Sequence, residues 1–282
     1  MKPNLYNLEG GVGKHLQFST LIEPLYKKYQ KKLIIYSGFP EIFNYNKHVA
    51  DSRLFAHNTF IDNSYQWFQK FDKIFYHDPY KSDWLKGNKH VVQQWSEMYE
   101  VEIKDVRPNF SINKEREKKL FDVIKNIGNF ILLQFTGGQG VIQSDYNKDN
   151  FGRNFKQGQD LIYLLQDAFP QHGLIVFGHD NEQQEYVGET KYKDNTGASL
   201  FCNREDFLIL SKYCKFFIGI DSSLQHMCSN QKFNKKGIVL WGSTMPNMFG
   251  YDTNVNLISE YPGCTEIEPK KIVEEALNLE IK

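Results

Sequence analysis

Residues 216–246 contain two short apolar runs, and each run stops abruptly at small polar residues. The first run, residues 216–220, has the length and composition of a buried strand and is followed directly by Asp221 and two serines. The second run, residues 237–241, is followed by Gly242, Ser243 and Thr244. The carboxyl ends of parallel strands form the ligand crevice of an α/β sheet, so these hydroxyls and backbone amides predict a site for an anion such as a diphosphate.

The same alternation of strand and helix recurs along most of the chain. Further strands are predicted at residues 4–8, 32–36, 74–77, 130–135 and 174–177. Helical periodicity is found at about residues 14–29, 89–99, 114–126, 158–169, 206–214 and 269–280. Residues 43–75 show no clean period. The pattern predicts an α/β protein.

A change of pattern near the middle divides the chain. Residues 101–112 hold Pro108 and alternate charged with apolar side chains, so we place a linker at about residues 106–113. A chain of 282 residues is also long enough for two domains of ordinary size. We therefore expect domains at residues 1–112 and 113–282, and we expect the last helix, residues 269–280, to pack back toward the N-terminal domain.

The charge balance and the cysteines limit the function classes. With 34 Lys and Arg against 34 Asp and Glu, a protein dedicated to non-specific nucleic-acid binding is not expected. Residues 1–126 hold 20 basic and 15 acidic side chains, a net charge of +5, which leaves −5 for the rest. The four cysteines have no paired metal-binding spacing, and neither a secretory h-region nor an apolar run of about 18 residues occurs. We expect a soluble, cytoplasmic protein with reduced thiols and no membrane insertion.

The glycine-rich turn EGGVGKH follows the first predicted strand. A phosphate-binding loop would need Gly in place of Leu8 and Ser or Thr in place of His15, so an ATPase is kept only as an alternative. Glycines let a substrate approach the backbone, and we predict that Gly11, Gly13 and Lys14 contact an acceptor or a phosphate. The other interpretation is a turn required only for packing the strand against the helix.

Two other strand ends carry candidate binding residues. Residues 134–140, QFTGGQG, form a second glycine loop, and Arg153 lies a short way downstream. A cation there can neutralise a diphosphate leaving group, although solvation at the surface would also explain it. Asp221 and the two serines that follow can serve simply as a helix cap. His226 is expected near the exposed first turn, in contact with a phosphate or sugar, and the alternative is a histidine packed in the core.

The two apolar runs with their exits, FIGIDSSLQHM and IVLWGSTMP, resemble the donor-binding signature of the family 9 glycosyltransferases, the ADP-heptose:lipopolysaccharide heptosyltransferases. In that family an apolar strand ends in Asp-Ser-Gly, a His follows, and a second strand ends in Gly-x-Thr-x-Pro. The matching residues are Asp221, Ser222, His226, Gly242, Thr244 and Pro246, and Ser223 replaces the usual glycine. QFTGGQG with GRNF, residues 89–101 and residues 11–25 are similar to further segments of the family.

This resemblance implies a GT-B architecture, in which two Rossmann-like domains with parallel sheets face each other across a cleft. It implies an inverting, metal-independent transferase that moves a sugar from a nucleoside-diphosphate sugar to a hydroxyl. The N-terminal domain would bind the acceptor and the C-terminal domain the donor. The expected donor-binding residues are Thr136, Gly138, Arg153, Asp221, Ser222, Ser223, His226, Gly242, Ser243 and Thr244.

One residue departs from the family pattern. The family's base is an Asp directly after the first-loop glycine, and here Lys14 stands in its place. A lysine of ordinary pKa is protonated near neutral pH and is a poor base, so we expect Glu9 or His15 to deprotonate the acceptor. The acceptor stays open between a lipopolysaccharide core sugar and a hydroxylated base in DNA. A catalytically silent nucleotide-sugar-binding protein is a further alternative.

Overall fold

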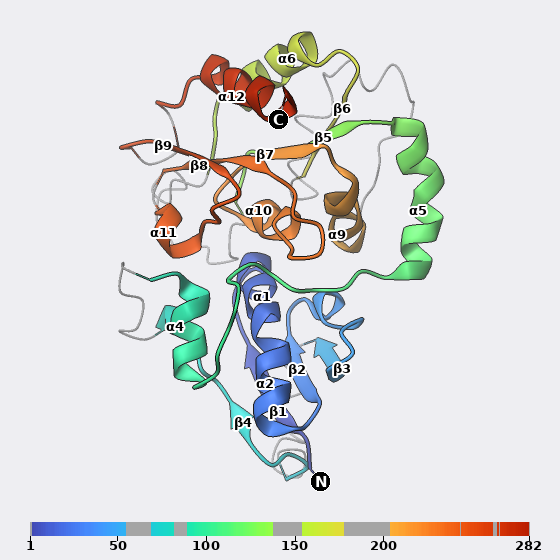
Figure 1. Cartoon of the computed structure of the whole chain (residues 1–282), viewed down its shortest axis with the longest axis vertical. Helices are drawn as coiled ribbons and strands as arrows, with labels where there is room; N and C mark the ends of the chain where they lie inside the picture. Colours follow the sequence, from blue (N-terminus) through green and yellow to red (C-terminus); the bar gives the residue numbers. More distant parts are fainter. Residues whose placement is uncertain are drawn as a thin grey trace. The chain divides into compact units, whose positions relative to one another are not determined.

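The computed structural model describes residues 2–54, 69–81, 89–137, 154–177, 204–242, 244–261, 264 and 266–281. The chain divides into two compact units, Met1–Ile112 (unit 1) and Asn113–Lys282 (unit 2), which are described separately. Each unit contains one parallel sheet flanked by helices, as Figure 1 shows. The predicted α/β class with two Rossmann-like units is confirmed.

The sheet of unit 1 has four parallel strands in the order β3-β2-β1-β4. The strands are β1 (Asn4–Leu8), β2 (Leu33–Ser37), β3 (Val49–Leu54) and β4 (Ile74–Phe75). The helical segments are α1 (Val12–Phe18), η1 (Ser19–Leu21), α2 (Ile22–Tyr29), η2 (Pro40–Ile42), η3 (Pro79–Lys81) and α4 (Val91–Met98). The order is that of the first four strands of a classical dinucleotide-binding sheet, with β1 at its centre.

The helical stretch after β1 begins at Val12, two residues earlier than its pattern suggested. Four of its side chains point inward and are buried, namely Leu16, Thr20, Ile22 and Leu25. Leu16 and Thr20 are four residues apart and Ile22 and Leu25 are three apart, which places each pair on one helical face. The helical period of this stretch is therefore read correctly, and only its first turn was assigned to the loop.

Strand β3 lies in the part of the sequence that showed no clean period. It pairs with β2 at the edge of the sheet, and its side chains are half-buried or exposed along its whole length. An edge strand without a buried face needs no alternation of apolar and polar residues. This explains why its sequence gave no signal.

Aromatic side chains fill the core of unit 1. The Tyr6 ring on β1 stacks on Phe75 of β4, with centroids 4.8 Å apart, and Phe18 of α1 packs edge-on against Trp95 of α4 at 5.1 Å. Tyr99, at the end of α4, contacts the rings of Tyr6, Phe18 and Phe75. The core thereby ties α1 and α4 to the neighbouring strands β1 and β4.

The sheet of unit 2 has five parallel strands in the order β6-β5-β7-β8-β9. The strands are β5 (Phe130–Gln134), β6 (Gly173–Val176), β7 (Phe216–Ile220), β8 (Gly237–Trp241) and β9 (Val255–Ile258). The helices are α5 (Lys114–Ile127), α6 (Gly158–Ala168), α9 (Arg204–Tyr213), α10 (Ser223–Cys228), α11 (Pro246–Phe249) and α12 (Pro269–Ile281). Numbered within the unit, the strand order is 2-1-3-4-5, the other common doubly wound arrangement.

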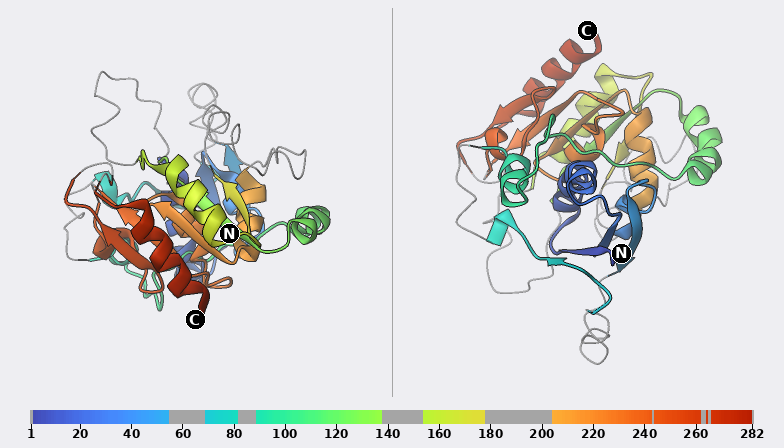
Figure 2. Two further views of the ribbon diagram at one scale, coloured as in Figure 1. Left: turned by 90° about the horizontal axis from the view of Figure 1, so that it is seen from above. Right: turned by 60° about the horizontal axis from the view of Figure 1, so that its bottom comes forward.

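Helices cover both faces of this sheet. Helices α6 and α12 lie side by side over one face, and α9 and α10 lie over the other (Figures 1 and 2). Because both faces are covered, β5, β7 and β8 are buried at every position and read as continuous apolar runs. The apolar face of α12, with Ile272 and Ala276, is buried in the core of unit 2. This face is therefore buried by unit 2 itself, and the expected packing of the helix toward the N-terminal domain stays a prediction.

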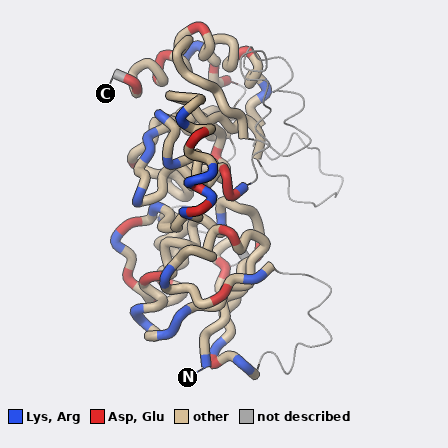
Figure 3. Tube along the Cα trace, turned by 90° about the vertical axis from the view of Figure 1, so that its right-hand side faces the viewer, with Lys and Arg blue, Asp and Glu red and all other residues tan. Residues whose placement is uncertain are grey.

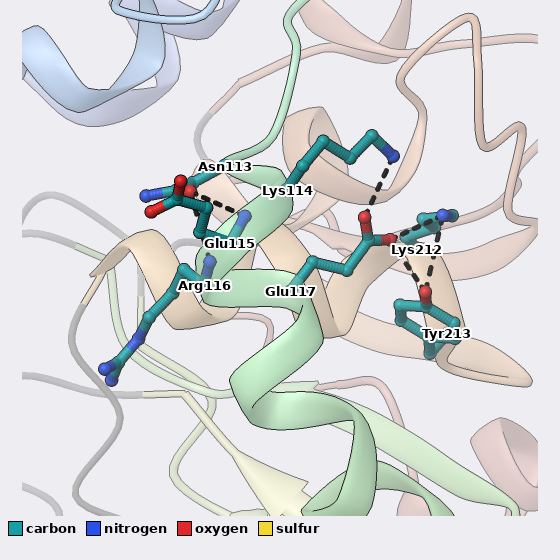
Figure 4. A network of polar contacts seen from close by, with 7 residues as sticks. All are labelled: Asn113, Lys114, Glu115, Arg116, Glu117, Lys212 and Tyr213. Carbon is teal, nitrogen blue, oxygen red and sulfur yellow. Dashed lines mark hydrogen bonds and ion pairs between the residues drawn. The ribbon is translucent and has the colours of Figure 1, made fainter.

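Helix α5 is fixed to α9 by a cluster of charges near its start, shown in Figure 4. Asn113 caps α5, because its Oδ1 accepts hydrogen bonds from the backbone N–H groups of Glu115 and Arg116. The Glu117 carboxylate accepts hydrogen bonds from Lys114, Lys212 and Tyr213. Burial opposes its ionisation, but these three donors prevail and lower the pKa of Glu117 to about 2. The start of α5 is thus bound to the end of α9 within unit 2.

Basic and acidic residues are mixed along the traces of both units in the view of Figure 3. Within the described part of the chain, no helix has both the length and the apolar composition needed to cross a membrane.

Candidate functional site

The chain of unit 2 changes direction across its sheet between β5 and β7. From β5 it passes to β6 on one side, and it later enters β7, β8 and β9 on the other. The carboxyl ends of the two strands at such a switch point form the ligand crevice of a doubly wound sheet. The residues at this point are therefore those that leave β5 and β7.

The exit of β7 is joined to β5 by the side chain of Gln134. The two hydrogens of Gln134 Nε2 are shared among three acceptors, Thr136 O at 3.1 Å, Ser222 Oγ at 3.2 Å and Ser223 Oγ at 3.4 Å. Its Oε1 accepts a hydrogen bond from the Leu224 backbone N–H at 2.9 Å. Ser222 makes no side-chain cap of α10, so Gln134 caps this helix from the neighbouring strand. The interpretation of the serines as a simple helix cap does not hold.

The direction of these hydrogen bonds determines what the serine hydroxyls can do. A hydroxyl carries one donated hydrogen and two acceptor lone pairs. Ser222 and Ser223 both accept from Gln134, and neither donates its own hydrogen to another described residue. Both hydroxyls can therefore act as donors toward a ligand, which is the polarity that a phosphate oxygen requires.

Asp221 connects the ends of three elements. It follows β7 directly, and its carboxylate accepts hydrogen bonds from the Thr244 hydroxyl, beyond β8, and from the Gln225 amide on α10. The Asp221 backbone N–H donates to Leu240 O at 3.1 Å. Asp221 is only 5% exposed, so it positions the loop after β8 rather than facing a ligand broadly. Gly242 and Thr244 are thereby held beside the β7 exit.

The exit of β5 lies against the segment that contains GRNF. Thr136 and Asn154 form an antiparallel bridge, and the Phe155 backbone N–H donates to Phe135 O at 2.8 Å. Asn154 and Phe155, which follow Arg153 in the sequence, are therefore paired with the exit of β5. Gly138, Arg153 and Ser243 lie outside the described residues, so their predicted contacts stay predictions.

His226 lies in a different environment from the one expected. It is 5% exposed, and its Nδ1 is 2.6 Å from the hydroxyl of Tyr251, which is buried as well. The two rings meet edge to face with centroids 5.6 Å apart. The helical turn carries His226 to the side that packs on the segment after α11, so it holds α10 in place. The predicted contact with a phosphate or sugar is not supported by this geometry.

Unit 1 has its own switch point, between β1 and β4. After β1, Gly10 adopts φ of +100°, a conformation that side chains with a Cβ rarely take. A Cβ at Gly10 would also lie 3.1 Å from the Lys14 side chain. Lys14 forms an ion pair with Asp78 from the exit of β4, and each side chain is 11% exposed. Gly11 and Gly13 lie in the same turn, at and after the start of α1.

The two predicted bases differ in accessibility. His15 is fully buried, with Nδ1 2.9 Å from Gly11 O and Nε2 3.3 Å from Leu8 O. Burial lowers the pKa of His15 to about 4, against smaller opposite effects of these carbonyls. The prediction that His15 takes a proton from a substrate does not fit this position, because no substrate atom can reach the ring. Glu9 is exposed and stays a candidate.

Two site residues were not predicted, Gln134 and Asp78. Gln134 was quoted within QFTGGQG, but its role depends on the pairing of β5 with β7, which lie far apart in the sequence. Asp78 follows a two-residue strand, and its partner Lys14 is 64 residues away. The available signal was that both residues stand at the end of an apolar run.

Two units, each with a parallel sheet and polar side chains at its switch point, define a two-domain α/β protein of the doubly wound class. No protein-family model and no curated protein matches the sequence. Solved structures do match its fold. A glycosyl transferase of family 9 from Veillonella parvula DSM 2008 aligns with a TM-score of 0.72 at 12% identity, over 99% of this chain and 97% of that one.

Two E. coli enzymes give similar alignments. The ADP-heptose LPS heptosyltransferase II matches with a TM-score of 0.66 at 12% identity, covering 99% of this chain and 98% of that one. A heptosyltransferase solved with ADP matches with a TM-score of 0.65 at 9% identity, covering 98% of this chain and 99% of that one. The chain therefore has the fold of the family 9 glycosyltransferases, as the sequence motifs indicated.

Proposed function

We propose that the protein is a glycosyltransferase that moves a sugar from a nucleoside-diphosphate sugar to an acceptor hydroxyl. The observation that carries the proposal is the β5–β7 switch point of unit 2, where the Gln134 amide lies within hydrogen-bond distance of the Ser222 and Ser223 oxygens and leaves their hydrogens available to a ligand. The likeness of the fold to that of glycosyltransferases over almost the whole chain supports the same conclusion.

Unit 2 binds the donor through its diphosphate. Ser222 and Ser223 offer hydroxyl donors at the β7 exit, and Asp221 holds Thr244 close to them. Arg153, which follows the β5 loop in the sequence, supplies positive charge for the leaving diphosphate. One structural neighbour was solved with ADP, and ADP-linked sugars are accordingly the first donors to test.

The chemistry is a direct displacement with inversion at the anomeric carbon and without a metal ion. An acceptor hydroxyl attacks this carbon, a base takes the hydroxyl proton, and the nucleoside diphosphate departs with the electron pair of the broken C–O bond. Unit 1 contributes the acceptor-binding residues around its glycine turn. The acceptor is a hydroxyl of a glycan, such as a lipopolysaccharide core sugar, or a hydroxylated base in DNA.

The test is the release of nucleoside diphosphate from a panel of ADP-, UDP- and GDP-linked sugars. Each donor is supplied with core oligosaccharides, with hydroxymethylated DNA, or with water as the only acceptor. We expect turnover of one donor class, unchanged by a metal chelator, and loss of donor affinity of about tenfold or more in Ser222→Ala. The matched control is Ser211→Ala, because the Ser211 hydroxyl serves only α9 and α10 backbone carbonyls in the same unit.

Three outcomes would contradict the proposal in different ways. If no nucleotide sugar binds or turns over, the function is wrong. Tight donor binding without turnover on any acceptor, or on water, would identify a silent nucleotide-sugar-binding protein. Magnesium-dependent ATP hydrolysis that is lost in Lys14→Ala would favour the ATPase alternative.

A further inference from the structure

The exit of β4 occupies the position in unit 1 that the exit of β7 occupies in unit 2. Strand β4 lies beside β1 on the side away from β2, so His77, Asp78 and Tyr80 leave the sheet at the switch point. They stand next to the glycine turn that follows β1, as the ion pair between Lys14 and Asp78 demonstrates. The sequence alone assigned no role to this segment.

Three neighbours fix the path of this segment. The Trp95 indole N–H on α4 donates to His77 O at 2.9 Å. The Tyr80 hydroxyl donates to Gln17 Oε1 at 2.8 Å, and Gln17 is fully buried on α1. The Lys14 ammonium lies 5.1 Å from the centre of the Tyr80 ring. The residues on either side of Asp78 are therefore held, His77 by α4 and Tyr80 by α1. This fixes the position of Asp78 with the accuracy that a catalytic group requires.

The residue placed in this way is Asp78. One carboxylate oxygen contacts Lys14, and the other accepts a hydrogen bond from the Tyr80 backbone N–H at 3.0 Å. An ionised carboxylate has about four lone-pair positions, so these two contacts leave others for a substrate hydroxyl. The side chain is 11% exposed, so part of it is accessible.

The other proton acceptors at this edge are less suited to the task. His15 is buried with both ring nitrogens against backbone carbonyls. Glu9 stands exposed on the turn beside Tyr76, whose pKa is raised by burial first and by the nearby Glu9 carboxylate second. Glu9 lies at the exposed surface of the turn, whereas the Asp78 side chain is only 11% exposed and is held by an ion pair and by a backbone hydrogen bond.

We propose that Asp78 is the catalytic base of unit 1, and that Lys14 is the residue that positions it. The inference rests on the proposed glycosyl transfer. In the step, the acceptor O–H proton passes to Asp78 as the acceptor oxygen bonds to the anomeric carbon. The bond from that carbon to the diphosphate breaks, and the nucleoside diphosphate leaves with the electron pair. The carboxylate that the sequence lacks after its glycine turn comes from the neighbouring strand.

The test is Asp78→Asn, assayed with the donor and acceptor that the wild type uses, or with water as acceptor if no other is found. Asparagine keeps the size of the side chain and its acceptor for the Tyr80 N–H but takes no proton. We expect kcat to fall by about 100-fold to 10,000-fold. The dissociation constant of the nucleoside diphosphate should stay within about twofold, because the diphosphate is held by unit 2.

The matched control is Asp72→Asn. Like Asp78, Asp72 forms an ion pair with a lysine, Lys31. It precedes β4, so it lies at the end of this strand opposite to the switch point. Its substitution should leave kcat within about twofold of the wild type, because exposed pairs contribute little. A role of Asp78 limited to stability would instead give similar small effects in both variants once each is fully folded.

If Asp78→Asn does not fold, the double variant Lys14→Met/Asp78→Asn is used instead, because it removes both charges of the ion pair. This double variant should also lose turnover while it still binds nucleoside diphosphate. If folded Asp78→Asn transfers the sugar with a kcat within about threefold of the wild-type value, the role of Asp78 is wrong but the proposed function stands. Absence of transfer in the wild type would overturn the proposed function itself.

Discussion

The two switch points of this protein are built from different chemistry on similar frames. In unit 1 the β1 and β4 exits meet through an ion pair, Lys14 with Asp78. In unit 2 the β5 and β7 exits meet through neutral hydrogen bonds from Gln134 to Ser222 and Ser223. Both sets of residues stand where the two strands at a switch point end, although Lys14 lies on α1 and Gln134 is the last residue of β5.

This difference matches two different tasks. Neutral hydroxyls whose hydrogens are available to a ligand suit an anion that must bind and later leave. A carboxylate fixed by a lysine suits the removal of a proton during a reaction. The comparison therefore assigns donor binding to unit 2 and proton transfer to unit 1, and the following variants test each side of it.

The largest effect on stability is expected for Lys14→Met. Removing the lysine leaves the Asp78 carboxylate, only 11% exposed, without its charged partner. We expect the free energy of unfolding to fall by about 3 kcal/mol, measured by urea denaturation at pH 7. Lys14→Met/Asp78→Asn should recover part of this loss, and equal losses in the single and double variants would show that the pair is not coupled.

A pH-dependent effect is expected from His15. Its folded-state pKa of about 4 lies below the ordinary value of 6.5, so the unfolded chain takes up the proton first as the pH falls. The stabilisation is complete above pH 6.5 and is lost as the pH falls toward 4. Between pH 7 and pH 5 this amounts to about 2 kcal/mol.

His15→Gln removes the titrating group while keeping an N–H donor for a backbone carbonyl. The loss of unfolding free energy between pH 7 and pH 5 should be smaller in this variant than in the wild type by about 2 kcal/mol. Unfolding curves of both proteins at the two pH values provide the measurement. Parallel pH dependences would mean that His15 is charged or exposed in the folded protein.

The smallest effect on stability is expected in unit 2, from Gln134. Gln134→Ala removes the acceptor for the Leu224 N–H and should cost about 1 kcal/mol of unfolding free energy. Gln134→Glu keeps that acceptor but cannot donate to Ser222, and it brings a negative charge to the diphosphate site. It should be the more stable of the two variants and the weaker binder of nucleoside diphosphate. If Gln134→Glu were instead the less stable variant and the tighter binder of nucleoside diphosphate, Gln134 would not have the role assigned to it in the donor site.

The sequence was informative where a pattern is local. The buried strands β7 and β8 were predicted at their observed bounds, because strands covered on both faces are uninterrupted apolar runs. Residues whose role depends on long-range contacts were not predicted from the sequence. Gln134 and Asp78 gain their roles from the pairing of β5 with β7 and of β1 with β4. His226 was misplaced because one helical turn can present a histidine either to solvent or to a packed neighbour, here Tyr251.

The most direct test of the division of tasks is the affinity for a nucleoside diphosphate, measured by calorimetry on three proteins. ADP is the first ligand, and UDP and GDP follow. We predict that Ser222→Ala combined with Thr244→Val weakens binding by about tenfold or more, while Asp78→Asn binds as tightly as the wild type. Unchanged binding in the unit 2 variant, or lost binding in folded Asp78→Asn, would contradict the assignment of the donor site to unit 2.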